Sequence, residues 1–138
     1  YEDDGEFLHI EGVPIYRPSV FAELIEQEAR RLKRMKSVFS LVALHVKTNG
    51  YDGDNSPKGM LTRIHDSLRE IDVIGQLADE IFVALLPDTD GQGAAIVCKR
   101  LERLAKSDPN LTVVGSVQVK QPADAAAFLH EASGTWRR

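Results

Sequence analysis

The sequence predicts an α/β (α+β) domain in which helices flank a mainly antiparallel central sheet of four or five strands. Its segments read as helix, strand, helix, strand, strand, helix, strand, helix, so two adjacent strands stand between helices. Ile81 to Leu86 is a continuous apolar run stopped by Pro87-Asp88, which is typical of a strand buried on both faces. The polar tip Asp79-Glu80 joins this run to a segment with apolar Val73, Ile74 and Leu77, which predicts a hairpin.

Length and composition indicate one soluble domain. The 138 residues suit a single core, and 43% hydrophobic with 28% charged residues is ordinary for a globular protein. The net charge of −4 argues against a nucleic-acid surface. One cysteine excludes an internal disulfide, and no apolar run approaches the ~20 residues of a membrane span. We therefore expect a cytoplasmic protein, or the cytoplasmic part of a membrane-associated one.

The N-terminal region is expected to differ from the rest of the chain. Residues 1–18 are acidic and then turn-like, which predicts an extended lead-in or linker, whereas residues 19–138 form the domain. Because the chain begins with Tyr1 rather than Met, we expect an upstream domain or processing. Ser19 is a plausible N-cap for a helix over about 19–36, in which acidic residues precede basic ones and complement the helix dipole.

The next segments are predicted from turn residues and apolar spacing. Val38 to Val46 is almost entirely apolar and predicts a central strand. Residues 47–59 contain Asn-Gly and Asp-Gly dipeptides and predict a loop. A helix over about 57–70 follows from apolar residues at helical spacing: Met60, Leu61, Ile64, Leu68 and Ile71.

After the hairpin the chain is predicted to form a helix, a strand and a final helix. Asp88-Thr89-Asp90 caps a helix over about 90–106, on whose apolar side Cys98 is expected to be an inert core thiol. Leu111 to Val119 alternates in character and predicts a strand. The last helix is expected from Pro122 to Gly134.

Three features share one register: Arg-x-x-Asp at 69–72, a hairpin tip six residues later, and the strand Phe82 to Leu86 closed by Pro87-Asp88-Thr89-Asp90. Together they resemble the GGDEF domain, the bacterial module that makes cyclic di-GMP. The resemblance covers about 19–133 and implies a nucleotidyl-cyclase/GGDEF-like fold.

The catalytic signature of that family is degraded. Ala78-Asp79-Glu80-Ile81-Phe82 stands where the family has Gly-Gly-Asp/Glu-Glu-Phe, so Ile81 replaces the metal-binding acid and offers Mg²⁺ no oxygen. The family's aspartate on the first strand matches His45 or a neighbour, and a neutral imidazole is a poor Mg²⁺ ligand. We expect His45 to bond to a neighbouring group, and we expect no metal, no cofactor and no cyclase activity.

The resemblance gives Arg69 and Asp72 a different role, because Arg-x-x-Asp ahead of the hairpin is the family's inhibitory site, which binds the product. A guanidinium can fork onto guanine O6 and N7, and a carboxylate can accept from guanine N1–H and N2–H₂. The basic residue that the family adds from the next helix matches Arg100, which would pair with a phosphate; Lys99 and Arg103 are nearby alternatives.

Three hypotheses follow. The first is an inactive GGDEF-like receptor for cyclic di-GMP in bacterial second-messenger signalling, which acts on an upstream domain or a protein partner through Arg69, Asp72 and Arg100. The second is a nucleotide-independent interaction module that could form a homodimer; Arg69 and Asp72 would then be an exposed ion pair worth ~0–1 kcal/mol. The third is a residual enzyme that uses Glu80 with Asp52 or Asp54.

Overall fold

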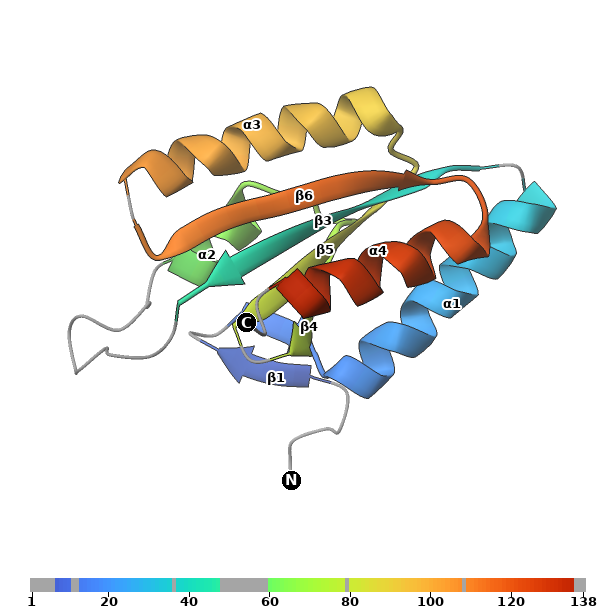
Figure 1. Ribbon diagram of the computed structural model, residues 1–138, viewed down its shortest axis with the longest axis horizontal. Coiled ribbons are helices and arrows are strands. Elements are labelled where there is room, and N and C mark those ends of the chain that lie inside the picture. The colour runs from blue at the N-terminus through green and yellow to red at the C-terminus, as the bar shows by residue number, and fades with distance from the viewer. Residues whose placement is uncertain are drawn as a thin grey trace.

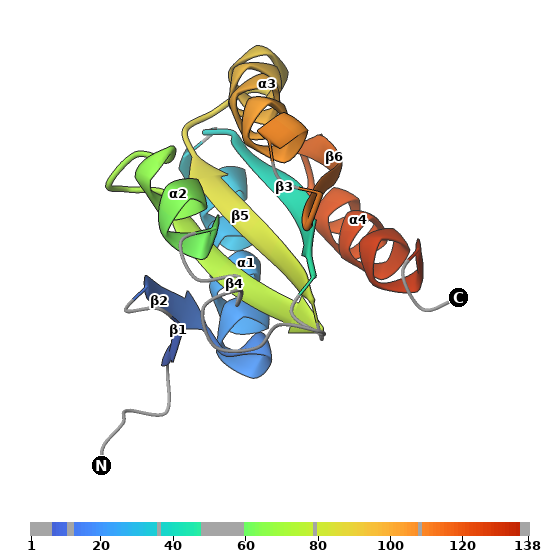
Figure 2. The same cartoon turned by 90° about the vertical axis from the view of Figure 1, so that its left-hand side faces the viewer.

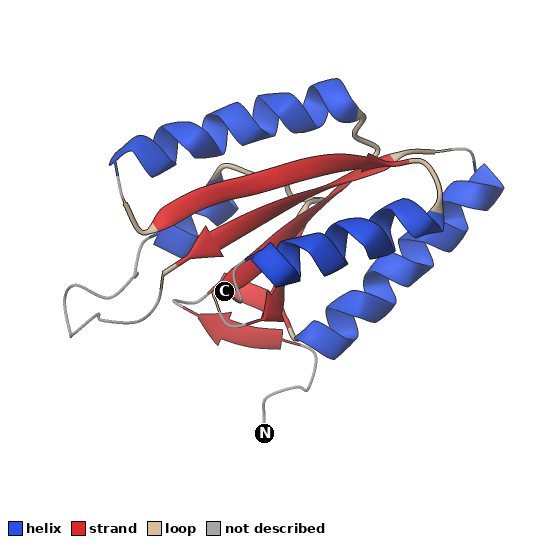
Figure 3. Cartoon of the chain, in the orientation of Figure 1, coloured by secondary structure: helices blue, strands red, loops and turns tan. Residues whose placement is uncertain are grey.

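The computed structural model describes residues 7–10, 13–35, 37–47, 60–78, 80–107 and 109–135, and within them six strands form one sheet with helices on both faces (Figure 1). The elements, coloured by type in Figure 3, are β1 Phe7–Ile10, β2 Val13–Tyr16, α1 Pro18–Met35, β3 Phe39–Val46, α2 Met60–Asp66, β4 Val73–Ala78, β5 Ile81–Pro87, α3 Gly91–Ser107, β6 Leu111–Val119 and α4 Pro122–Thr135. The order of element types after residue 18 is the one that the sequence predicts.

The sheet is mainly antiparallel, as predicted. Its strand order is β1-β2-β4-β5-β3-β6, in which β3 pairs antiparallel with β5 and β6, and β4 pairs antiparallel with β5. The expected four or five strands become six because β1 and β2 form within residues 1–18. They pair antiparallel with each other, and β2 runs parallel to β4 at Tyr16 and Gly75. The alternation of buried Val13 and Ile15 with Pro14 and Tyr16 explains this extra pairing.

Helices cover both faces of the sheet, with α2 and α3 on one side and α1 and α4 on the other (Figure 2). On β3, Val42 and Leu44 belong to the core under α2 and α3, whereas Leu41 and Ala43 belong to the core under α1 and α4. The central strand is therefore buried on both faces, which is why its sequence is almost continuously apolar. None of the helices in the described ranges is long and apolar enough to cross a membrane.

The observed helix ends agree with those predicted from the sequence to within a residue or two, except for α2. This helix ends at Asp66 rather than near residue 70, and the chain then turns before β4 begins at Val73. Residues 57–59, where the predicted helix begins, lie outside the described ranges. On α3, Cys98 is half-buried against the core, and burial raises the pKa of its thiol, so the group stays protonated at neutral pH.

Candidate functional site

The turn between α2 and β4 places Arg69 beside Asp72. The Asp72 N–H donates to the Arg69 carbonyl at 3.0 Å, which closes the turn. In return the Asp72 carboxylate accepts from the Arg69 backbone N–H at 2.7 Å. An aspartate that bonds to the backbone of its own turn is a common turn-stabilising device. The early end of α2 thus produces the geometry that holds the two residues together.

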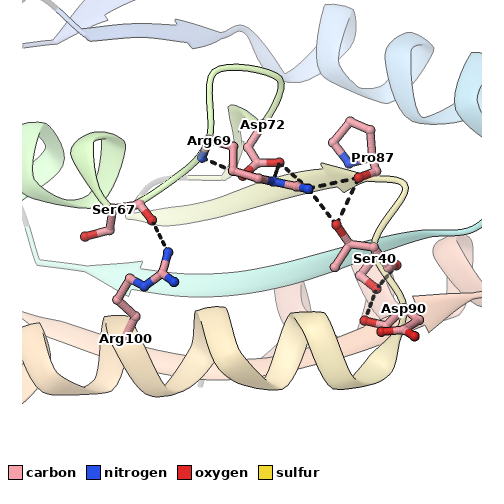
Figure 4. A network of polar contacts seen from close by, with 8 residues as sticks. Ser40, Ser67, Arg69, Asp72, Pro87, Asp90 and Arg100 are labelled. Carbon is pink, nitrogen blue, oxygen red and sulfur yellow. Dashed lines mark hydrogen bonds and ion pairs between the residues drawn. The ribbon is translucent and has the colours of Figure 1, made fainter.

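The Arg69 side chain is held by acceptors from three residues (Figure 4). Its Nη2 donates to Asp72 Oδ1 at 2.9 Å and its Nε to Oδ2 at 3.2 Å. The same Nη2 lies 2.9 Å from the Pro87 carbonyl and 2.6 Å from Thr89 Oγ1. The hydrogen bond with Asp72 raises the pKa of the Arg69 guanidinium above its ordinary value, although burial opposes the shift. Arg69 therefore remains a cation throughout the pH range of a folded protein.

The two partners differ in exposure, which separates their roles. The Asp72 side chain is 1% exposed and that of Arg69 is 48% exposed. Both carboxylate oxygens of Asp72 accept from Arg69, whereas Nη1 of Arg69 makes no hydrogen bond to any residue in the described ranges. The sequence predicts that Asp72 also accepts from a guanine edge, and this stays a prediction. In the structure the Asp72 carboxylate accepts from the backbone and the guanidinium of Arg69 and so orients that side chain.

Ser40 on β3 holds the loop between β5 and α3. Sequence reasoning missed this role of Ser40. Ser40 is buried on β3, and its hydroxyl donates to the Thr89 carbonyl at 2.8 Å (Figure 4). Thr89 in turn donates its hydroxyl to the Pro87 carbonyl at 2.9 Å. Pro87 at the end of β5 and Thr89, which Ser40 on β3 holds, are therefore placed to accept from Arg69. A serine in a strand whose only other polar residue is His45 is the sequence signal for this contact.

Arg100 approaches the same region from α3. Its Nη1 donates to the Ser67 carbonyl at 2.9 Å, which ties the helix to the turn after α2 (Figure 4). Arg69, Asp72 and Arg100 together line one pocket of about 400 Å³. Lys99 and Arg103, the alternatives considered from the sequence, are not among its lining residues.

The remaining lining residues give this pocket, which we call the Arg69 pocket, a mixed character. Asp88 and Asp90 lie between β5 and α3 and contribute two carboxylates. Ile96 contributes an aliphatic side chain that is 59% exposed, an unusual exposure for isoleucine. The pocket therefore offers two guanidinium groups, an apolar surface that a flat ring could cover, and an acidic side that disfavours anions.

The hairpin tip has different chemistry. Glu80 takes a left-handed conformation with φ of 67°, and its carboxylate lies 3.2 Å from Nε2 of His45. Ile81 pairs with His45 across the sheet and is 2% exposed. Asp79, Asp52 and Asp54 lie outside the described ranges. Within those ranges there is no group of three or more His, Cys, Asp or Glu residues that could hold a metal ion.

Comparison with known proteins shows the fold. No protein-family model and no curated protein matches the chain. The GGDEF domain of DgcB from Caulobacter crescentus, solved with c-di-GMP, is similar over 98% of this chain and 91% of its own, with a TM-score of 0.74 and 14% identity. The FimX GGDEF domain from Pseudomonas aeruginosa covers 88% of each chain at a TM-score of 0.70 and 16% identity.

A third similar structure describes a novel interaction mode between a microbial GGDEF domain and cyclic di-GMP. It has a TM-score of 0.69 and 15% identity over 96% of this chain and 95% of its own. At such low identity these likenesses show that the chain has the fold of GGDEF domains. Its ligand and activity have to be argued from its own residues.

Proposed function

We propose that this chain is a catalytically inactive GGDEF-like domain that serves as a cytoplasmic receptor for cyclic di-GMP. One observation carries the proposal: a guanidinium oriented by a buried carboxylate faces a pocket that a second arginine also lines. The motif Arg69-x-x-Asp72 is retained, whereas Ile81 stands where the family resemblance requires a metal-binding acid. Two of the similar GGDEF structures were determined with the same dinucleotide, which supports the choice of ligand.

Recognition would begin with Arg69. Asp72, Pro87 and Thr89 hold its Nε and Nη2, so the plane of the guanidinium is set before a ligand arrives. The Nη1 donors can then reach the O6 or N7 acceptor of a guanine, and the planar cation can stack on a purine. Such preorganisation reduces the entropy lost on binding.

Arg100 would supply the phosphate contact. Its guanidinium now donates to a neutral carbonyl, that of Ser67, and a phosphate oxygen is a stronger acceptor for the same group. Because Asp88 and Asp90 repel an anion, we place the phosphates on the Arg100 side of the pocket and a base on the side of Arg69 and Ile96. Binding would change the surface that the domain presents to an upstream domain or a protein partner.

Titration calorimetry with cyclic di-GMP tests the proposal. Wild type should bind, and Arg69→Ala and Arg100→Ala should each weaken binding about tenfold or more, because a charge-assisted contact contributes roughly 1.5–3 kcal/mol. Arg103→Ala is the matched control, since Arg103 lies on the same helix but does not line the pocket. Absence of heat with wild type, or equal weakening by all three substitutions, would contradict the receptor proposal.

Exposed aliphatic residues favour a second candidate, a nucleotide-independent interaction module. Two large hydrophobic residues are exposed here: Ile71, in the turn between α2 and β4, and Ile96, in the Arg69 pocket. Both would suit a protein contact on this surface. This candidate expects partner binding to fall with Ile96→Asp and to be insensitive to Arg69→Ala. The receptor proposal expects partner binding to respond to Arg69→Ala whenever the dinucleotide is present.

A further inference from the structure

The outer face of α1 carries an ordered stripe of charge. Glu23, Glu26, Arg30 and Lys33 are separated by three, four and three positions, so they lie along one side of the helix, and all are exposed. The acidic pair occupies the N-terminal half and the basic pair the C-terminal half. Within the chain, Glu26 and Arg30 approach to only 3.8 Å with side chains 66% and 72% exposed, so that contact is weak.

A groove runs beside this stripe, between α1 and α4. It has a volume of about 560 Å³, and apart from Glu23 and Glu26 its lining is apolar: Ala22, Ile25, Ala29, Pro122, Ala123, Ala125, Ala126 and Leu129. An apolar floor with an acidic rim suits a long cationic side chain, because the aliphatic stem can cover the floor while the charged end reaches the rim. Arginine and lysine both have this form.

We infer that a second copy of this chain docks on this surface through an antiparallel pairing of the two α1 helices. With a two-fold axis at the level of residue 28 along α1, Glu23 of one copy faces Lys33 of the other, and Glu26 faces Arg30. The symmetry makes each pair twice. The stems of Arg30 and Lys33 from the second copy then cover the groove beside Glu23 and Glu26.

Charge complementarity selects this arrangement over other pairings of the same surface. A parallel pairing of the two helices would place carboxylate against carboxylate and cation against cation, which is unfavourable. The antiparallel pairing satisfies every member of the stripe within one closed interface. It involves neither Arg69 nor the Arg69 pocket, so it stands independently of nucleotide binding.

The association is expected to be weak and sensitive to salt. The pairs lie at the surface, where one ion pair contributes ~0–1 kcal/mol, and the groove is lined largely by small side chains. Analytical ultracentrifugation of the unliganded chain should show a concentration-dependent dimer at low ionic strength. The dimer should disappear at about 1 M salt, where the Debye length falls to ~3 Å. A wild type that stays monomeric at low ionic strength and high concentration would overturn the inference.

Charge exchange between two variants provides the decisive test. Glu23→Lys with Glu26→Lys makes the stripe wholly basic, and Arg30→Glu with Lys33→Glu makes it wholly acidic, so each variant alone should be monomeric. An equimolar mixture should dimerise, because every facing pair is then complementary. Glu102→Lys, an exposed change on α3, is the matched control and should leave the wild-type dimer intact. Dimers of either variant alone, or no association in the mixture, would refute the α1 interface.

A chain carrying all four substitutions separates a lost interface from a damaged helix. Its stripe is reversed but again self-complementary, so it should dimerise like wild type, and circular dichroism should confirm that each variant is folded. Reversal opposes the helix dipole, so a small loss of thermal stability is expected. A folded four-substitution chain that remains monomeric would count against the proposed register.

Discussion

Thr89 has an effect on the Arg69 pocket that its size does not suggest. Its hydroxyl accepts from Arg69 Nη2 at 2.6 Å and donates to the Pro87 carbonyl at 2.9 Å, so one oxygen joins the guanidinium to the end of β5. Its backbone carbonyl is held by the buried Ser40. Asp72 fixes one side of Arg69 and Thr89 fixes the other. Removal of either should leave a charged side chain that samples more conformations and binds less well.

We expect Thr89→Val to weaken binding of cyclic di-GMP several-fold while the fold is maintained, because valine keeps the shape of threonine but removes the acceptor. The loss should stay below that of Arg69→Ala, since Asp72 and Pro87 still hold the guanidinium. Calorimetry gives the affinity and thermal unfolding reports the fold. Thr89→Ser should restore binding by returning the hydroxyl. Thr112→Val, at an exposed position on β6, should leave binding unchanged.

An unchanged affinity for Thr89→Val, beside a large loss for Arg69→Ala, would show that Asp72 and Pro87 orient the arginine without Thr89. A failure of Thr89→Ser to restore binding would show that the methyl group, rather than the hydroxyl, matters at this position. Either result would remove Thr89 from the network that we assign to the pocket.

At the scale of elements, Gly75 sets how closely α1 packs against β4. A Cβ placed on Gly75 would lie 2.0 to 2.5 Å from three ring atoms of Phe21, so the aromatic ring occupies the space that a side chain would need. Phe21 is fully buried and stacks near Tyr16 at the end of β2, with ring centroids 6.4 Å apart. The absence of a side chain at Gly75 therefore allows α1, β2 and the β4–β5 hairpin to pack against one another.

Gly75→Ala should destabilise the chain by about 1–3 kcal/mol, the usual effect of overpacking a dense core. Gly115→Ala is the matched control on β6, because a Cβ there would meet no atom within 4 Å. Its effect should stay within about 0.5 kcal/mol. Urea denaturation followed by circular dichroism measures both. Equal stability of the two variants would mean that Phe21 can move aside and that α1 is held mainly by its other buried residues.

The element scale also shows where sequence reasoning loses information. The strands β3 and β5 could be predicted because burial on both faces makes them almost wholly apolar. β1 and β2 could not, because four residues are too few to display a period beside nearby Gly and Pro. The end of α2 was placed too late, because Leu68 and Ile71 continue the helical spacing although the chain has already turned.

For the whole molecule, the fold class could be predicted from the sequence, and so could three residues that line the Arg69 pocket, namely Arg69, Asp72 and Arg100. The contacts that orient Arg69 could not be predicted. The spacing of Arg69 and Asp72 indicated a local pair, and the register suggested Arg100. Ser40 and Thr89 are 49 positions apart, and only the pairing of β3 with β5 brings them together. Long-range contacts of this kind follow from the register of the strands, which composition and spacing leave undetermined.

Catalysis is a prediction at the scale of the whole molecule, because cyclase chemistry needs a metal site assembled from separate elements. We expect no cyclic di-GMP from GTP with Mg²⁺ or Mn²⁺, measured by chromatography of the nucleotide products. On β3 and at the hairpin, the positions that the family resemblance assigns to metal ligands hold His45 and Ile81. His45 is 3.2 Å from Glu80, and Ile81 points into the protein with 2% exposure. Mg²⁺ requires several oxygen ligands, and among the described residues the hairpin tip provides one carboxylate, that of Glu80, beside an imidazole. The same assay on Glu80→Gln tests whether any turnover depends on the Glu80 carboxylate. Turnover in wild type that this variant abolishes would establish a residual enzyme built on Glu80 and end the proposal of an inactive receptor.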